Sequence, residues 1–131
     1  MFGGGGLRPF TLAPIDRGCV NTVIYDVTNE NGDSISKLNK KLYITAKTQP
    51  WDMDADDSDA TFKEQGTIPD NDEPGRVVFT LTESDTYKDP GEYFFDIVET
   101  DLDGTNAHRL ALGNFFIIGG ANNAQAGGDA A

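Results

Sequence analysis

The stretch from Gly75 to Gly120 constrains the fold most, because it holds three apolar runs of strand length bounded by turn residues. The runs span 76–82, 92–100 and 109–118. A period of two places alternate side chains on opposite faces of a strand, so each run can bury one face and expose the other. This stretch therefore predicts three β-strands.

Short turn sequences join the three runs. Asp89-Pro90-Gly91 lies between the first two runs, where Pro presets φ and Gly tolerates a positive φ. Asp103-Gly104 lies between the second and third runs and is a strong hairpin signal. We therefore predict an antiparallel meander of three consecutive strands, which a second sheet from the rest of the chain must cover.

The earlier part of the chain supplies further strands. Residues 19–28 predict a strand rich in β-branched side chains, and 40–47 predict a second strand with Leu42, Ile44 and Ala46 on one face. Asn31-Gly32 between them predicts a tight turn. Residues 61–68 predict a short strand, and the two prolines of 8–15 confine that segment to an edge strand or an extended arm. No segment shows a convincing helical period. This pattern predicts an all-β fold, an immunoglobulin-like antiparallel β-sandwich of about six to eight strands, with a small barrel as the alternative.

Tyr93 follows the Pro90-Gly91 step and has two interpretations. It suits a sheet-to-sheet corner, with its ring in the core and its hydroxyl on the backbone. It is equally well an ordinary core tyrosine.

Glycine-rich segments flank the predicted sandwich. Residues 1–7 contain four consecutive glycines, and 119–131 lack any branched or aromatic side chain. We expect both to be flexible, with one folded domain over 8–118. The opening MFGGGGLRPF has no basic start followed by an apolar block, so we expect no secretory signal.

Negative charge is concentrated in the middle of the chain. The net charge is −12, and residues 52–103 hold three Lys or Arg against seventeen Asp or Glu. Such a surface repels nucleic acid and anionic membranes, so we expect neither as a partner. It favours a basic protein partner or divalent cations.

One acidic loop is a candidate calcium site. Alternating carboxylates suit a cation that takes six to eight oxygen ligands. Asp101 and Asp103, in another turn, would add ligands if the two loops met. The alternative is a solvated acidic loop without an ion, and no other cofactor is expected. The candidate ligands are Asp52, Asp54, Asp56, Asp57 and Asp59.

Catalytic interpretations fit the sequence poorly. The single Cys19 lies far in sequence from the single His108, which argues against a thiol nucleophile with its base. There is no phosphate-binding glycine loop and no zinc motif. We therefore expect no enzyme. An alternative function is a carbohydrate-binding or adhesion module using Trp51, Tyr87 and the acidic loop, with calcium.

Several strand and turn stretches between Asp16 and Ile118 form a recognisable pattern. They are the Asp16-Arg17-Gly18 turn, Val27 to Gly32, Ile44 to Lys47, Asp57 to Ala60, Leu81 to Thr86, Pro90 to Ile97 and Leu110 to Ile117. In this pattern the chain resembles an immunoglobulin-like domain of tailed-bacteriophage virion proteins, and it is similar to the N-terminal domain of phage baseplate upper proteins.

The resemblance implies a non-enzymatic structural protein of the virion. Its role would be capsid decoration or an adaptor at the neck, tail or baseplate, assembled in the host cytoplasm. Partners would be other virion proteins in a multicopy homo- or hetero-oligomer. The candidate contact residues are Arg8, Pro9, Phe10 and Trp51.

Overall fold

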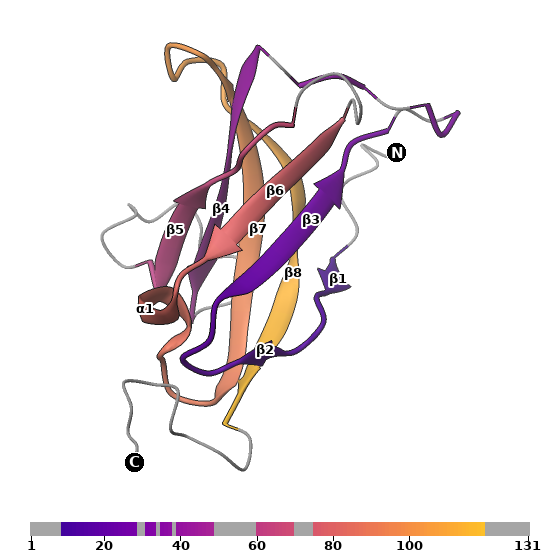
Figure 1. The fold of residues 1–131 in the computed structure, drawn as a ribbon. Helices are drawn as coiled ribbons and strands as arrows, with labels where there is room; N and C mark the ends of the chain where they lie inside the picture. The colour runs from indigo at the N-terminus through magenta and orange to yellow at the C-terminus, as the bar shows by residue number, and fades with distance from the viewer. Residues whose placement is uncertain are drawn as a thin grey trace.

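The computed structural model describes residues 9–28, 31–33, 35–37, 39–48, 60–69 and 75–119 (Figure 1). These residues form eight β-strands and one short helix. The elements are β1 (Phe10–Thr11), β2 (Ile15–Asp16), β3 (Asn21–Asp26), β4 (Lys40–Lys47), β5 (Phe62–Gln65), β6 (Arg76–Leu81), α1 (Glu83–Thr86), β7 (Gly91–Asp101) and β8 (His108–Ile118).

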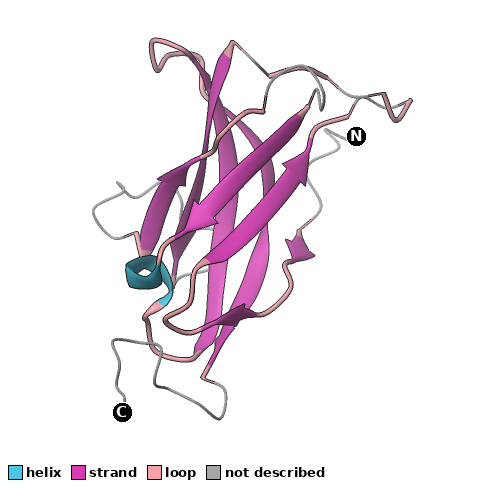
Figure 2. Cartoon of the chain, viewed as in Figure 1, coloured by secondary structure: helices cyan, strands magenta, loops and turns pink. Residues whose placement is uncertain are grey.

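The strands form two sheets, which confirms the all-β sandwich (Figure 2). The larger sheet has the order β1-β8-β7-β4-β5, with β2 also paired to β8, and the smaller sheet contains β3 and β6. On one side, Thr67 after β5 forms an antiparallel bridge with Val78 of β6. Among the described residues no such bridge closes the opposite side, at β3, so the arrangement is an open sandwich and not a barrel.

The hairpin predicted from Asp103-Gly104 is confirmed. Strands β7 and β8 pair antiparallel, with a register shift between Ile97 and Val98. In the turn between them, Gly104 has a φ of +87°, a conformation that favours glycine. The Asp103 carboxylate accepts hydrogen bonds from the backbone N–H and the hydroxyl of Thr105, at 3.0 and 2.6 Å.

The predicted three-strand meander is wrong in its first half. Strand β6 pairs with β3 in the smaller sheet and not with β7. The reason is the connection from Thr82 to Pro90, which is too long for a tight hairpin and carries the chain from one sheet to the other.

Helix α1 in this connection also corrects the expectation that the chain has no helix. The Thr82 side chain accepts from the backbone N–H of Asp85 at 3.1 Å, and the Asp85 carboxylate accepts from the backbone N–H of Thr82 at 2.9 Å. This reciprocal capping box fixes a single helical turn. A four-residue helix is too short to produce a helical period in the sequence.

Tyr93 lies at the corner where the chain enters β7, as its corner interpretation predicted. Its ring is buried and stacks on Phe115, with ring centroids 5.7 Å apart. Its hydroxyl donates a hydrogen bond of 2.6 Å to the carbonyl oxygen of Asp89. The same side chain therefore anchors the core and fixes the incoming turn.

The described part of the predicted segment 8–15, from residue 9 onward, contributes the edge strands β1 and β2, as its prolines indicated, but they pair parallel and not antiparallel. Phe10 lies opposite Gly113 in β8, and Ile15 lies opposite Ile117. A Cβ atom at residue 113 would overlap the Phe10 backbone, so glycine permits this close approach. The Phe10 ring then packs edge-on against Phe95, with centroids 5.3 Å apart.

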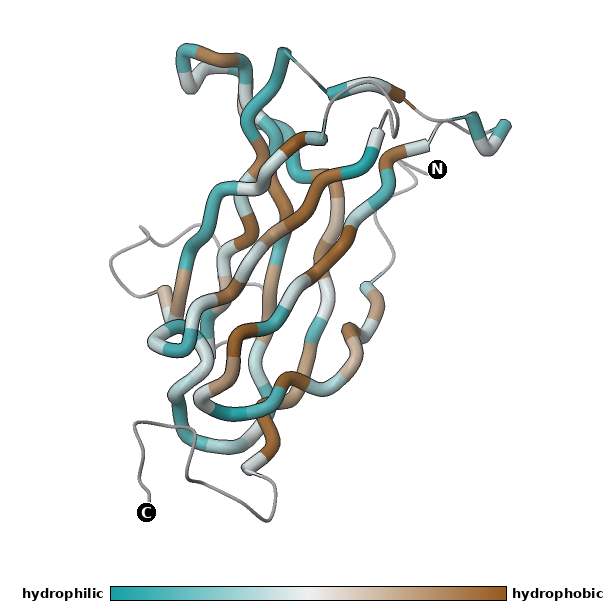
Figure 3. The backbone as a smooth tube through the Cα atoms, in the orientation of Figure 1, coloured by the Kyte–Doolittle hydropathy of each residue, from teal (hydrophilic) through white to brown (hydrophobic). Residues whose placement is uncertain are grey.

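The core is built from buried residues of both sheets. Hydrophobic and hydrophilic residues alternate along much of the strands, as predicted (Figure 3). Leu42, Ile44 and Ala46 of β4 point inward, as expected, and are fully buried. The remaining buried apolar residues are Ile15, Phe62, Val77, Phe79, Leu81, Tyr93, Phe95, Ile97, Ala111, Phe115 and Ile117.

No helix in the described part of the chain is long and apolar enough to cross a membrane. Of the flanking segments predicted at 1–7 and 119–131, only Gly119 falls within the described residues.

Candidate functional site

The free side of β3 is the first candidate site. Val27 donates its backbone N–H to the carbonyl of Gly75 at 2.9 Å, and this bond continues the β3–β6 register. Hydrogen-bonded pairs alternate along an antiparallel ladder, so the odd-numbered residues of β3 bond to β6. The N–H and C=O groups of Thr22, Ile24 and Asp26 therefore point away from β6. We call these three residues the β3 edge.

A groove runs beside the β3 edge. It is a cavity of about 240 Å³ between residues Leu12–Ile15, which comprise the link from β1 and the first residue of β2, and residues Asn21–Ile24. The linking segment does not pair with β3, because its flanking strands are hydrogen-bonded to β8 instead. Asn21, which lines the groove, donates a side-chain hydrogen bond to the carbonyl of Cys19 at 3.0 Å.

The outer surface of β3 is apolar in its centre. Ile24 is 54% exposed and lies opposite Val78, and Val20 just before the strand is 60% exposed. At one end Arg76 donates two hydrogen bonds to the carboxylate of Asp26, at 2.8 and 3.0 Å. These bonds hold the pKa of Asp26 below its usual value.

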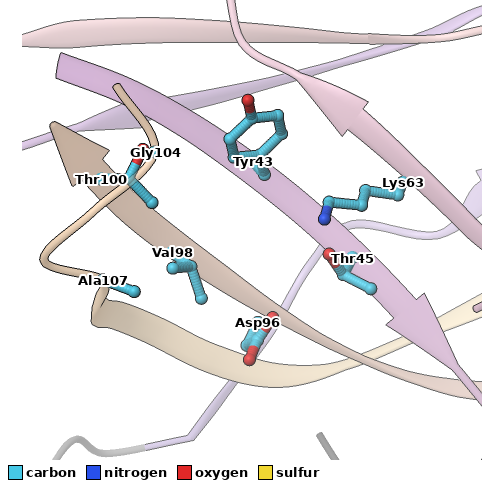
Figure 4. Close-up of a pocket in the computed structure, with 8 residues that line it drawn as sticks. All are labelled: Tyr43, Thr45, Lys63, Asp96, Val98, Thr100, Gly104 and Ala107. Carbon is cyan, nitrogen blue, oxygen red and sulfur yellow. The ribbon is translucent and has the colours of Figure 1, made fainter. Parts of the chain in front are cut away.

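A pocket of about 360 Å³ in the outer face of the larger sheet is the second candidate site (Figure 4). Its residues come from β4, β5, β7 and the turn before β8. They are Tyr43, Thr45, Lys63, Asp96, Val98, Thr100, Gly104 and Ala107. Because the floor is a sheet, successive inward-pointing core residues of β4 and β7 hold these outward-pointing ones in fixed positions.

The pocket combines buried polar groups with an aromatic ring. Asp96 is buried and accepts a hydrogen bond from Nε of Arg109 at 3.1 Å. The Lys63 ammonium lies over the Tyr43 ring, 5.0 Å from its centroid. Thr45 and Thr100 are also buried. Polar groups in a water-accessible concave site can hydrogen-bond a small polar ligand.

Glu64 and Asp85 form a carboxyl pair on the other face of β5. A hydrogen bond with Asp85, followed by burial, raises the pKa of Glu64 to about 7. A shared proton explains this direction, because two carboxylates in contact cannot both be ionised without repulsion. Since Asp85 also caps α1, the pair connects the edge of the larger sheet to the connection between the sheets.

The described residues place Cys19 and His108 in different parts of the fold. Cys19 lies beside α1, where its carbonyl accepts from the Thr86 hydroxyl at 2.8 Å, whereas His108 begins β8 opposite Glu99. No three metal-ligating side chains cluster in this part of the chain. Asp101 accepts from Lys40 and Asn106, at 2.6 and 2.7 Å, and these hydrogen bonds lower its pKa.

Most of the predicted site residues lie outside the described residues. They are Arg8, Trp51, Asp52, Asp54, Asp56, Asp57 and Asp59. Of the predicted contact residues, Pro9 is exposed and Phe10 is 41% exposed despite its contact with Phe95. Tyr87 is exposed and has the Arg17 guanidinium 4.5 Å from its ring centroid.

Sequence reasoning missed both candidate sites. Asp96 inside the apolar run 92–100 was an available signal for the pocket, because a charged residue there must face outward or be paired. Nothing local signals that β3 has one free side, because this depends on which strands pair.

No protein-family model matches this sequence, and no curated protein matches it. The candidate function therefore rests on the geometry and on the resemblance of the sequence.

Proposed function

We propose that this chain is a non-enzymatic structural component of a tailed-bacteriophage particle. It decorates the capsid or serves as an adaptor at the neck, tail or baseplate, and it acts through contacts with other virion proteins. The observation that carries the proposal is the β3 edge, which has backbone groups that point away from β6 and the exposed apolar side chain of Ile24. Strand addition at such an edge is a common mode of protein recognition.

The charge of the chain supports a protein partner over nucleic acid or membrane. With a net charge of −12, the domain is repelled by phosphate-rich surfaces. The same charge speeds encounter with a basic protein surface, and this steering weakens as salt is added.

Particles from a phage lacking the chain test this function. The purified, fluorescently labelled chain is mixed with them and the particles are recovered by gradient centrifugation. The proposal expects saturable uptake, and complete particles that already carry the chain serve as the control and should take up little label. Absence of uptake by the deficient particles would overturn the proposal.

A carbohydrate-binding module is the second candidate, and the outer-face pocket is the observation that favours it. Buried Asp96 and Thr45 beside the Tyr43 ring are the kind of groups that hold a sugar. Binding on a glycan array that is lost in Tyr43→Ala and retained in Tyr87→Ala would support this function. Loss in Tyr87→Ala alone would instead point to the site first expected from the sequence.

Calcium binding by the acidic loop remains a proposal that chelation can test. If the loop holds calcium, adding a chelator to the calcium-loaded chain lowers its melting temperature, since a ligand bound only by the native state stabilises it. If the melting temperature is the same with millimolar calcium and with chelator, the loop does not bind calcium.

A further inference from the structure

We propose that β3 of one copy pairs antiparallel with β3 of a second copy, so that the two smaller sheets join into one continuous sheet. This inference rests on the proposed structural function and names a partner for the β3 edge. The pairing is isologous, with the same strand used by both copies about a two-fold axis.

Comparison of the exposed edges singles out β3. Strand β1 has only two residues and is flanked by Pro9 and Pro14, and β5 has four residues that include Lys63 and Glu64. Short length, proline and charge are features that protect an edge from further pairing. Strand β3 has six residues in continuous register, without proline, lysine or a bulge. It is the unprotected edge among the strands that the structure describes.

The alternation of β3 restricts the register of the proposed pair. Side chains opposite each other in an antiparallel pair must lie on the same face, so even-numbered residues meet even-numbered residues. A pair centred on Ile24 places this residue against Ile24 of the second copy. The backbone groups of these residues, which point away from β6, then form the new hydrogen bonds.

This register is also favourable for the polar residues. It places Thr22 opposite Asp26 of the second copy, so a hydroxyl donor faces a carboxylate. A pair centred on Asp26 would oppose two carboxylates, which is destabilising. Within each copy the Asp26 carboxylate is already paired with Arg76. The negative charges of the two Asp26 side chains are therefore compensated where the two β3 strands meet.

The high net charge gives this pairing a distinctive salt dependence. Two copies of charge −12 repel each other at long range, and salt screens this repulsion, with a Debye length of about 10 Å at 0.1 M. Self-association should therefore strengthen as NaCl rises from about 20 to about 500 mM. Docking to a basic partner would weaken over the same range.

Sedimentation and light scattering of the full chain test the pairing. We expect a species of twice the 14.1 kDa protomer mass to appear as concentration rises from about 1 to about 200 µM. Ile24→Arg, which adds a like charge to each side of the seam, should raise the dimer Kd by at least about tenfold. Thr80→Arg, on the same face of β6 but away from the edge, is the matched control and should leave the Kd unchanged.

A proline variant tests the backbone directly. The N–H of Ile24 points away from β6, so Ile24→Pro removes a group that the monomer does not use and should keep the native circular dichroism. The Ile24→Pro substitution should abolish the dimer, because the new strand pair loses this N–H donor in each copy. Should this variant unfold, amide exchange of the unmodified chain decides instead: the Ile24 N–H is expected to become protected as the dimer forms.

Three results would overturn the pairing: a monomer at every concentration, a dimer that neither variant weakens, or an Ile24 N–H that exchanges equally fast in monomer and dimer. The two proposals fail separately. A chain that stays monomeric but binds deficient particles loses only the β3 pairing. A chain that pairs through β3 but is never taken up by particles loses the assembly role.

Discussion

The two sheets of this domain differ in how far each satisfies its own backbone. In the larger sheet, β7 lies between β4 and β8, and β8 lies between β7 and the pair β1 and β2. In the smaller sheet, β3 and β6 have six residues each and β3 is paired on one side among the described residues. The inner strands of the larger sheet are thus paired on both sides, whereas β3 of the smaller sheet is paired with β6 alone among the described residues.

The comparison predicts that truncating the aromatic centre of the larger sheet has the largest effect. Phe115 is fully buried and its ring packs against Phe62, Tyr93 and Phe95. Phe115→Ala should lower the free energy of unfolding by about 3–5 kcal/mol, measured by chemical denaturation. Phe116→Ala, at the next residue but 42% exposed, is the control and should change it little. Equal losses in both variants would contradict the assignment of β8 faces.

The pairing of β1 with β8 should depend on Gly113, which lies against the Phe10 backbone. In Gly113→Ala the new methyl group overlaps the Phe10 backbone, so β1 must move away from β8. We expect a loss of about 1–3 kcal/mol in the free energy of unfolding, with faster amide exchange at Leu12, which donates to Asn114. Gly119→Ala makes only an ordinary contact with Pro90 and should be neutral. Unaltered exchange at Leu12 in Gly113→Ala would show that β1 is not held there.

The connection between the two sheets should be sensitive to its helix cap. Thr82→Ala removes the side-chain acceptor of the Asp85 N–H and should lower the free energy of unfolding by about 1 kcal/mol. Thermal or urea unfolding measures this change. Ser84→Ala, at an exposed position of the same helix, provides the comparison. A Thr82 variant as stable as the Ser84 variant would mean that the capping box does not hold the connection.

The smallest expected effect is a pH dependence from the Glu64 and Asp85 pair. Glu64 has its pKa raised to about 7 in the folded chain, so its contribution to stability is complete below its unfolded pKa and is lost as pH rises through about 7. The melting temperature should therefore fall modestly between about pH 5 and about pH 8.

Glu64→Gln should flatten this part of the pH profile, whereas Glu83→Gln, an exposed carboxyl of α1, should keep it. Asp26, Asp101 and Asp103 have lowered pKa values, so their contributions are lost only at acid pH, below this window. A slope that is the same with and without Glu64 would rule out the shared proton.

The strands were more predictable from the sequence than their partners. Residues 40–47 and 109–118 differ from the observed β4 and β8 by at most one residue at an end, because alternation and flanking turns are local signals. The partner of β6 was mispredicted, because pairing depends on how the connection crosses the core. The sequence did not predict α1, because a four-residue helix is too short to show a helical period of apolar residues. Thr82 and Asp85 nevertheless have the spacing of a capping box.

The candidate sites were less predictable than the fold. The open side of β3 exists because Phe10 and Ile15 pair with β8, and no residue of β3 itself encodes that choice. The outer-face pocket joins Tyr43, Lys63 and Asp96, which are far apart in sequence and become neighbours through the strand order β7-β4-β5.

The parallel pairing of β1 and β2 with β8 also determines how the domain bears mechanical load. The chain enters the sandwich at Pro9 and leaves it at Gly119, and because the terminal strands run the same way, the two exits point in opposite directions. Tension between the exits would load the bonds from Leu12 to Asn114 and from Arg17 to Ile118 together, in shear. These bonds would have to break together, whereas tension across the sheet would open them one after another.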